Sequence, residues 1–291
     1  MTSQTTTADP TTTTPETDRI TRLKSAAHRI RHNALTMGEV QGQGYIGQAL
    51  GVADILAVAY ADQLRYRPED PDWEDRDRFL LSIGHYAIAL YAALAEAGTV
   101  PLEELDTYGS DESRLPMSAM ASYTPGVEIS GGSLGHGLTV TTGMALGLRH
   151  LGNPARVFNL LSDGELDEGS TWEAAMACAH HGLDNVTAIV DVNALQADGP
   201  TAGVLRTEPV LDKWRAFGWH ATRVDGNDLP ALVAAFDAAA AHSGSPSVII
   251  CDTRIGSGVP LLMEREKAHF MRVEEHEWQI ARTQLDETFA E

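Results

Sequence analysis

Two side chains that could bind a metal ion each follow an apolar run of the sequence. Asp163 comes just after the run at 157–161, and Asn193 comes directly after the β-branched run at 186–192. One helical pattern separates the two runs, so we expect a βαβ unit whose parallel strands end at the same edge of a sheet. Carboxylate and amide oxygens are ligands that Mg²⁺ prefers. The spacing therefore predicts a site for a hard divalent cation at this edge.

The residues after Asp163 suggest what the cation would hold. Gly164 allows a bulky anion to approach the backbone, and Ser170 with Glu173 forms the S-x-x-E pattern of a helix start. A helix N-terminus favours an anionic ligand, so a metal-bound diphosphate is the ligand we expect. Either dipeptide alone, D-G or N-A, could be only a turn, because such turns are common. Their joint spacing favours the binding site.

The predicted elements place this unit in a larger α/β fold. Helical spacing covers 20–35, and apolar or small-residue helices are expected at 52–64, 87–97 and 134–151. Further along the chain, strands at 157–161, 186–192, 220–224 and 248–252 alternate with helices at 170–181, 210–217 and 228–242. This alternation predicts a doubly wound, mostly parallel sheet with helices on both faces.

Composition limits the class of protein. Among 291 residues, 41 are acidic and 21 are Lys or Arg, which gives a net charge of −20. This charge argues against nucleic acid and anionic membrane surfaces as partners, and an anionic ligand would need a metal ion. No apolar run is long enough to cross a membrane. Cys178 and Cys251 cannot form a disulfide framework, which fits a reducing compartment.

The ends of the chain differ from its middle. Residues 1–18 are rich in Thr and poor in apolar side chains, so we expect a disordered tail, followed by one domain at 19–291. The tail does not resemble an export signal, and we expect a cytoplasmic protein. The end of the chain, EWQIARTQLDETFAE, is expected to be exposed and partly helical.

Two other patterns match known motifs but lack their context. Residues 42–47 read GQGYIG, yet a helical pattern precedes them instead of a strand, which argues against a dinucleotide site. His28 and His32 stand four residues apart but lack the Glu of H-E-x-x-H. We therefore do not expect a zinc protease.

Longer blocks carry a family resemblance. The segment SDGELDEGSTWEAAMACAHHGLDNVTAIVDVN resembles the thiamine diphosphate signature, and it is specifically similar to the N-terminal half of transketolases. The blocks DRDRFLLSIGHYAIALYAAL, TPGVEISGGSLGHGLTVTTGMALG and CDTRIGSGVPLLMEREKAHF agree in order and spacing, so the resemblance covers residues 20–270. It implies the thiamine-diphosphate-binding fold and transfer of a two-carbon ketol unit from a ketose to an aldose. The implied cofactors are thiamine diphosphate and Mg²⁺.

The resemblance also implies roles for single residues. The cofactor-binding residues would be His85, Gly132, Leu134, Asp163, Gly164, Asn193, Leu195 and His269. Asp163, Asn193 and the main-chain oxygen of Leu195 would hold the metal. His85 and Gly164 would contact the diphosphate, whereas Gly132 and Leu134 would border the cofactor rings. His85 and His269 would be catalytic, and Glu168 would lie at a subunit contact.

Four positions depart from the pattern of the family. The first Gly of the signature is Ser162, a small change. Tyr45 and Ser118 stand where many transketolases have His, and His136 replaces a Gln. Tyr45, Ser118 and His136 are therefore predicted substrate contacts, and a substrate set other than the ordinary pentose phosphates is expected.

The resemblance implies a missing half. The family needs a catalytic Glu from a pyrimidine-binding domain, for which the sequence up to Glu291 leaves no room. We therefore expect a split transketolase whose partner is a C-terminal subunit with that domain, in an α2β2 assembly acting on sugars or sugar phosphates. Two alternatives stay open. The chain could belong to another thiamine diphosphate enzyme, of the 2-oxo acid dehydrogenase or synthase type, or it could be a non-catalytic subunit that holds the cofactor.

Overall fold

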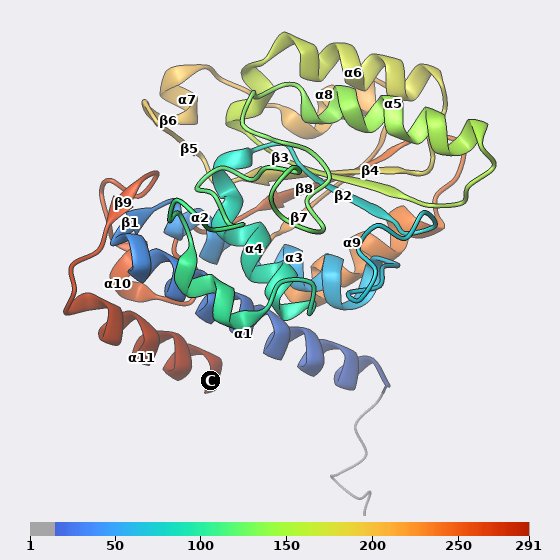
Figure 1. Cartoon of the computed structure of the whole chain (residues 1–291). Helices are drawn as coiled ribbons and strands as arrows, with labels where there is room; N and C mark the ends of the chain where they lie inside the picture. Colours follow the sequence, from blue (N-terminus) through green and yellow to red (C-terminus); the bar gives the residue numbers. More distant parts are fainter. Residues whose placement is uncertain (1–14, 291) are drawn as a thin grey trace, which may run out of the picture.

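A five-stranded parallel sheet forms the centre of the molecule (Figure 1). The computed structural model describes residues 15–290, and the strands lie in the order β2-β3-β4-β8-β7. Their bounds are Arg78–Leu81, Val157–Ser162, Val186–Val192, Ser247–Asp252 and His220–Asp225 in that order. β3 and β4 are buried almost along their whole length, as expected for a parallel sheet covered on both faces. The predicted α/β architecture is confirmed.

Three helices cover one face of the sheet: α5 (Gly137–His150), α6 (Gly169–His180) and α8 (Val210–Ala216) (Figure 1). Side chains of these helices and of the sheet form one apolar cluster, in which Trp214 is fully buried. Each strand contributes alternate residues to this cluster, since successive side chains point to opposite faces. Leu161 lies on this face, whereas its neighbour Leu160 lies on the other.

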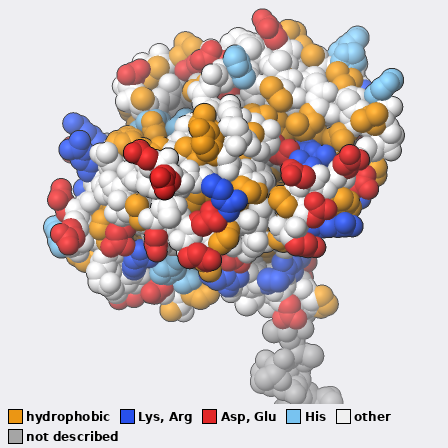
Figure 2. Space-filling view, viewed as in Figure 1, with side chains coloured by type: hydrophobic (Ala, Val, Ile, Leu, Met, Phe, Trp, Pro, Cys, Tyr) orange, Lys and Arg blue, Asp and Glu red, His pale blue; other side chains and the backbone are white. Residues whose placement is uncertain are grey.

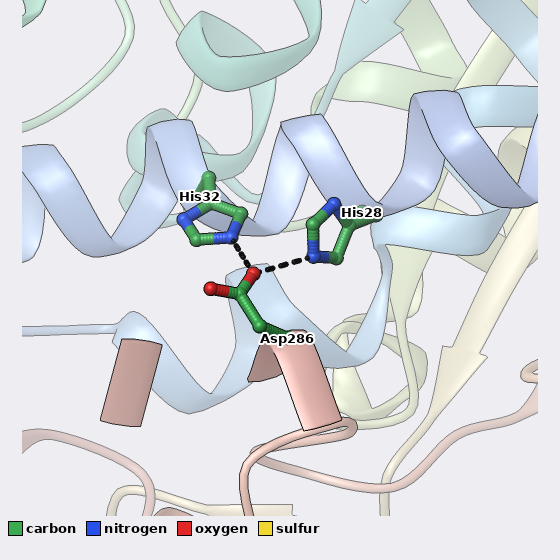
Figure 3. A group of neighbouring side chains, drawn as sticks. All are labelled: His28, His32 and Asp286. Atoms are coloured by element: carbon green, nitrogen blue, oxygen red, sulfur yellow. Dashed lines mark hydrogen bonds and ion pairs between the residues drawn. The ribbon is translucent and has the colours of Figure 1, made fainter. Parts of the chain in front are cut away.

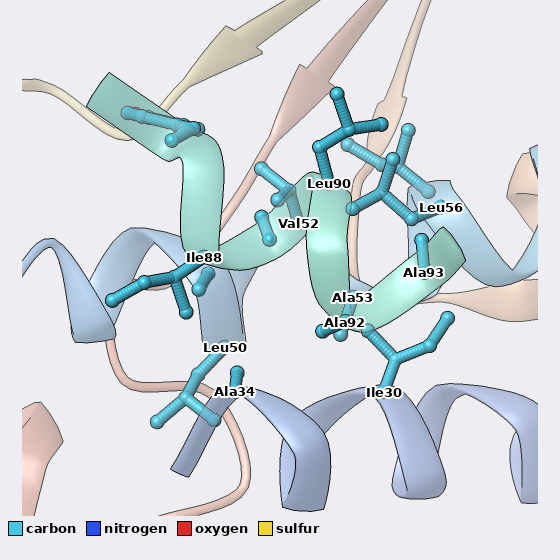
Figure 4. Packing of buried hydrophobic residues seen from close by; sticks show 14 of the residues in the cluster. Ile30, Ala34, Leu50, Val52, Ala53, Leu56, Ile88, Leu90, Ala92 and Ala93 are labelled. Atoms are coloured by element: carbon cyan, nitrogen blue, oxygen red, sulfur yellow. The ribbon is translucent and has the colours of Figure 1, made fainter. Parts of the chain in front are cut away.

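The second face carries a larger layer of helices. Its members are α1 (Pro15–Gln41), α2 (Ile46–Gly51), α3 (Ala53–Val58), α4 (Ala87–Glu96) and α9 (Leu229–Ala241). Figure 4 shows the packing of Ile30, Leu56 and Leu90 in the apolar cluster of this layer. Every residue of α3 is buried, and five of its six residues are apolar; the exception, Asp54, forms an ion pair with Arg31.

The last helix, α11 (Glu277–Ala290), packs against α1 and α10 (Pro260–Met263). Trp278, Ala281 and Leu285 are buried, so the expectation of a merely exposed end was wrong, because this helix has an apolar stripe that closes the core. The expected tail at 1–18 also needs correction. Residues 1–14 lie outside the described part, but 15–18 form the first turn of α1.

Several local elements differ from the predictions. The edge strand β2 was not predicted, and the expected helix at 52–64 is interrupted after α3 by a π-helical turn, η1 (Ala59–Gln63). Ser170 does not cap α6; its hydroxyl donates a hydrogen bond to the carbonyl of Gly135 at 3.0 Å. Other short elements are η2 (Gly84–Tyr86), η3 (Leu102–Thr107), η4 (Gly164–Asp167) and α7 (Thr201–Val204). Over residues 15–290, no helix has both the length and the apolar character needed to cross a membrane.

Two small antiparallel sheets lie outside the central one. β1 (Gln43–Gly44) pairs with β9 (Met271–Arg272), and β5 (Leu195–Gln196) pairs with β6 (Gly199–Pro200). The first pairing joins the segment after α1 to the segment after α10. It therefore brings residues near 45 close to residues near 270, although they are far apart in the sequence.

Candidate active site

The ends of β3 and β4 bring Asp163 and Asn193 into one cluster, as the βαβ argument predicts. The backbone N–H of Asp163 donates to the carbonyl of Asp191 at 2.9 Å, which continues the pairing of the strands. The backbone N–H of Ala194 and the hydroxyl of Thr201 donate to Asp163 Oδ2 at 3.0 and 2.9 Å. These bonds hold the Asp163 carboxylate beside the segment that carries Asn193.

Asp191 is a residue of this cluster that the sequence analysis missed. It is fully buried at the end of β4 and accepts hydrogen bonds from Tyr86 Oη at 2.7 Å, Asn193 Nδ2 at 2.6 Å and Thr253 Oγ1. Asp191 holds the nitrogen of the Asn193 amide, and Asn193 Oδ1 accepts a hydrogen bond from the backbone N–H of Leu195 at 3.0 Å. The available signal was a carboxylate inside the otherwise apolar run VTAIVDV.

The electrostatics of the cluster favour a bound cation. Burial, followed by the charge of Asp191, raises the pKa of Asp163 to about 7. Burial also raises the pKa of Asp191, and within residues 15–290 neither carboxylate has a Lys or Arg partner. Two neighbouring buried carboxylates with spare oxygen lone pairs match the ligand chemistry of a hard divalent ion. The donor set therefore fits Mg²⁺.

Three aromatic rings meet beside this cluster. The ring centroids of Tyr45 and His85 are 4.6 Å apart, those of Tyr45 and His269 are 5.4 Å apart, and those of the two histidines are 5.9 Å apart. Burial and the neighbouring His269 lower the pKa of His85 to about 4. His85 is therefore neutral at pH 7, with one ring nitrogen as donor and the other as acceptor.

Gln48 on α2 positions His269 and was also missed by the sequence analysis. Its side-chain nitrogen donates to the carbonyl of His269 at 2.7 Å and lies 3.3 Å from the Nδ1 atom of that ring. Gln48 is 1% exposed, and its Oε1 atom is buried without a hydrogen-bond partner among residues 15–290. A hydrogen bond with the backbone of Leu195 raises the pKa of His269, while burial lowers it more strongly. Leu195 and His269 are therefore direct neighbours.

The loop that carries Gly132 and Leu134 lies directly on the turn of His85. A methyl group on Gly84 would lie 2.3 Å from the carbonyl carbon of Gly131, so both positions need glycine for the backbones to pack this closely. Gly132 adopts φ +115°, a conformation that glycine favours, and remains exposed. Leu134 is half-buried and packs on the core.

Glu165 fastens this loop to the end of β3. The backbone N–H of Gly135 donates to Glu165 Oε1 at 2.7 Å, and the hydroxyl of Ser82 donates to the same atom. Burial raises the pKa of Glu165 to about 7, and in the described part of the chain its buried Oε2 atom has no hydrogen-bond partner. Glu168 lies next to this loop, because a methyl group on Gly135 would be 2.8 Å from the Cβ of Glu168. The Glu168 side chain is exposed.

The predicted substrate residues are not all brought together. Tyr45 lies against both histidines, and Ser118 is exposed, with its hydroxyl 3.5 Å from the carbonyl of Gly131. His136 is exposed at the start of α5, and no hydrogen bond or ring contact in the described chain joins it to Tyr45 or Ser118. Tyr45 thus lies beside the histidines, whereas Ser118 lies beside Gly131 and His136 follows Gly135 in the same loop.

The family description "Transketolase, thiamine diphosphate binding domain" matches residues 23–289. The chain belongs to this family. It is 63% identical over 257 residues to the transketolase family protein y4mO of Sinorhizobium fredii, covering 88% of this chain and 92% of the relative. It is 38% identical to the 6-deoxy-6-sulfo-D-fructose transketolase subunit SqwG of a Clostridium species, covering 91% of this chain and 96% of the relative.

A solved transketolase has the same fold. The crystal structure of transketolase from Campylobacter jejuni superposes with a TM-score of 0.84 at 30% identity, covering 92% of this chain. This chain spans 43% of that transketolase, whereas it spans nearly all of the two relatives named above. The chain is therefore a transketolase-type protein with a thiamine-diphosphate-binding domain. The expected family and fold are confirmed.

Proposed function

We propose that this chain is the cofactor-binding subunit of a two-component transketolase, which transfers a two-carbon ketol unit from a ketose to an aldose. The observation that carries the proposal is the pair of buried carboxylates, Asp163 and Asp191, beside Asn193 at the strand ends of a transketolase domain. In this proposal the Asp163 carboxylate, Asn193 Oδ1 and the main-chain oxygen of Leu195 hold Mg²⁺. All three are oxygen donors, the ligand type that hard cations prefer, and their choice rests on the resemblance to transketolases.

The proposed cofactor contacts surround that metal. Bound thiamine diphosphate would supply the carbon nucleophile that cleaves the bond next to the ketose carbonyl. Gly164 and His85 would contact the diphosphate, while Gly132 and Leu134 would border the rings. Neutral His85 can donate a hydrogen bond from one ring nitrogen to a phosphate or a developing oxyanion without introducing a charge. His269, held by Gln48, would serve near both diphosphate and substrate.

Substrate selection is proposed to depend on Tyr45, with Ser118 and His136 as further contacts. The Tyr45 ring contacts the rings of His85, His269 and Phe270. A relative is named for 6-deoxy-6-sulfo-D-fructose, a ketose whose far end is not a phosphate. We therefore propose a donor outside the ordinary pentose phosphates.

The proposed partner is a C-terminal transketolase subunit that carries the pyrimidine domain and its catalytic Glu. The support is that a relative of nearly the same length is named a transketolase subunit. We propose an α2β2 complex in the cytoplasm, with Glu168 at the contact between subunits. Glu168 is exposed beside the glycine loop, where it is available to a second chain.

Co-expression with a C-terminal transketolase subunit encoded nearby tests the proposal. The purified complex is expected to bind thiamine diphosphate only with Mg²⁺ in calorimetry, and to transfer a ketol unit from at least one ketose of a panel. The panel should include xylulose 5-phosphate and 6-deoxy-6-sulfo-D-fructose. Turnover by this chain alone would contradict the two-component assignment. Pyruvate decarboxylation without ketol transfer would instead support a 2-oxo acid enzyme.

A further inference from the structure

Two helices that the proposed reaction does not use carry a second cluster of metal-binding side chains. His28 and His32 lie on α1, four residues apart, and Asp286 lies on α11 (Figure 3). Residues at this spacing face the same side of a helix. One ligand atom from each of the three residues lies within 4.8 Å of the other two. Within residues 15–290, this is the one cluster of three or more His, Cys, Asp or Glu residues with that geometry.

The three side chains already converge on one point. His28 Nε2 lies 3.0 Å and His32 Nε2 lies 2.7 Å from the same atom, Asp286 Oδ1. Ligand atoms of a tetrahedral zinc ion, each about 2.0–2.2 Å from the metal, are about 3.3 Å apart. To reach that separation, the distances from Asp286 Oδ1 to His28 Nε2 and His32 Nε2 would lengthen by about 0.3 and about 0.6 Å. This is within the reach of rotamer adjustments of half-buried histidines and an exposed carboxylate.

The surroundings hold the histidines in place and offset nearby charge. The ring of Phe289 stacks on His28 with centroids 4.1 Å apart and planes at 24°. The nearby cation Arg31 is neutralised by Asp54, which accepts two hydrogen bonds from it at 3.1 and 2.5 Å. Asp286 is exposed, so a water molecule from solvent can serve as the fourth ligand.

We propose that His28, His32 and Asp286 bind one borderline divalent ion of the zinc type, and that this ion fastens α11 to α1. Two imidazoles and one carboxylate suit Zn²⁺ better than Mg²⁺, because imidazole nitrogen is a borderline ligand. The site lies on elements other than those that carry Asp163 and Asn193, so it is separate from the proposed magnesium site. Its role would be structural, because the ion would join the C-terminal helix to the core.

Metal binding by the full chain tests this proposal. Tag-free protein is stripped with a chelator, supplied with excess Mg²⁺ and thiamine diphosphate to fill the other site, and titrated with Zn²⁺. We expect one equivalent of Zn²⁺ per chain, and with Co²⁺ we expect visible absorption bands of a tetrahedral site. At a Zn²⁺ concentration about 100 times Kd, Tm should rise by about 5 °C.

Three variants decide the assignment. Asp286→Asn keeps an acceptor for both imidazoles but removes the carboxylate, and it should abolish the Zn²⁺ equivalent and the Tm shift; His32→Ala should do the same. The control is His220→Ala with His242→Ala, a stacked pair at 4.3 Å without a third ligand, which should leave both signals unchanged. Unchanged Zn²⁺ binding in Asp286→Asn, or no bound Zn²⁺ in the wild type, would overturn the proposal. In either case the trio would be a hydrogen-bonded contact between helices. Circular dichroism of each variant separates loss of binding from loss of folding.

Discussion

Single residues at the strand ends combine a proposed binding role with a cost in stability. Asp163 and Asp191 are both buried, and their mutual repulsion and desolvation disfavour the charged forms when no cation is bound. Removing one of these charges would improve the stability of the free chain. Proteins retain such destabilising groups where function requires them.

Asp163→Asn separates these two effects. The variant keeps the size of the side chain but removes one of two neighbouring buried charges, so the Tm of the cofactor-free chain should equal or exceed that of the wild type. Affinity for thiamine diphosphate with Mg²⁺ should fall by more than about 100-fold, since even residues behind metal ligands cost 10–100-fold. Differential scanning fluorimetry and calorimetry measure the two quantities. Undiminished cofactor affinity would contradict the metal role of Asp163.

His85 predicts a pH dependence that can be read directly. Its pKa in the folded chain, about 4, lies below the ordinary value of 6.5, so the folded state binds fewer protons than the unfolded state between these values. The contribution of His85 to the free energy of unfolding is therefore fully present above pH 6.5 and is lost as the pH falls through about 4. Nitrogen-detected NMR of the cofactor-free chain, assigned with His85→Gln, should show a neutral ring at pH 5.5. A charged ring at that pH would refute the prediction.

At the scale of elements, a contact between Gly84 and Gly131 sets the position of the loop at 131–135. β2 ends at Leu81, and the next turn packs backbone to backbone against the loop at 131–135. The buried carboxylate of Glu165 then ties that loop to β3. Three segments of the chain thus depend on one close contact.

Gly131→Ala tests this contact. Its new methyl group would lie 2.3 Å from the carbonyl oxygen of Leu81, so the loop must move. We expect a destabilisation of about 1–3 kcal/mol, as for other overpacked sites, together with weaker cofactor binding. Gly143→Ala on α5 is the matched control, because a methyl group there meets nothing within 4 Å and should stabilise the helix by up to about 1 kcal/mol. Urea denaturation distinguishes the two, and equal effects would refute the role of the contact.

The helix layer on the second face depends on a buried ion pair. Arg31 on α1 and Asp54 on α3 are 8% and 6% exposed, and Arg31 also donates to the carbonyls of Leu50 and Ser257 at 3.1 Å. Asp54→Ala leaves a buried charge without its partner and should cost about 3–5 kcal/mol of unfolding free energy. Arg282→Ala removes a more exposed pair with Glu39 and should cost less than about 1 kcal/mol. A small effect of Asp54→Ala in chemical denaturation would show that water reaches Arg31.

At the scale of the molecule, surface and charge bear on assembly. Figure 2 shows acidic side chains spread over the visible face, in keeping with a net charge of −20. Large hydrophobic side chains such as Met117, Met120 and Tyr123 are exposed in the segment between η3 and α5. Exposed apolar side chains that gather in one segment are typical of surfaces that contact another protein.

Glu168→Ala should therefore affect the assembly and not the fold. The side chain is exposed, so the Tm of the chain alone should change little. Loss of a charged hydrogen bond, about 1.5–3 kcal/mol, would weaken the complex with the partner about 10–100-fold. Sedimentation analysis of the complex measures this, with Glu103→Ala on η3 as a surface control. Equal affinity of both variants would remove Glu168 from the interface.

Local patterns were sufficient for the framework and for part of the site. Strands β3, β4, β7 and β8 and the helices between them were predictable, because periodicity and turn residues are properties of neighbouring positions. The meeting of Asp163 with Asn193 followed from the handedness of parallel βαβ units, which holds without knowledge of side chains. Strand β2 was missed because its four residues carry too little pattern.

The tertiary structure alone decided which polar residues support the site and which helices meet. Gln48 contacts His269 across 221 positions of sequence, and Asp191 and Glu165 act through burial, which no local pattern reveals. The same holds for Asp286 against His28 and His32, since the packing of α11 on α1 depends on the whole core. The sequence by itself determined four of the five strands of the sheet, the meeting of Asp163 with the segment of Asn193, and the family. The fold decided the contacts between distant segments, because these depend on three-dimensional packing and not on spacing along the chain.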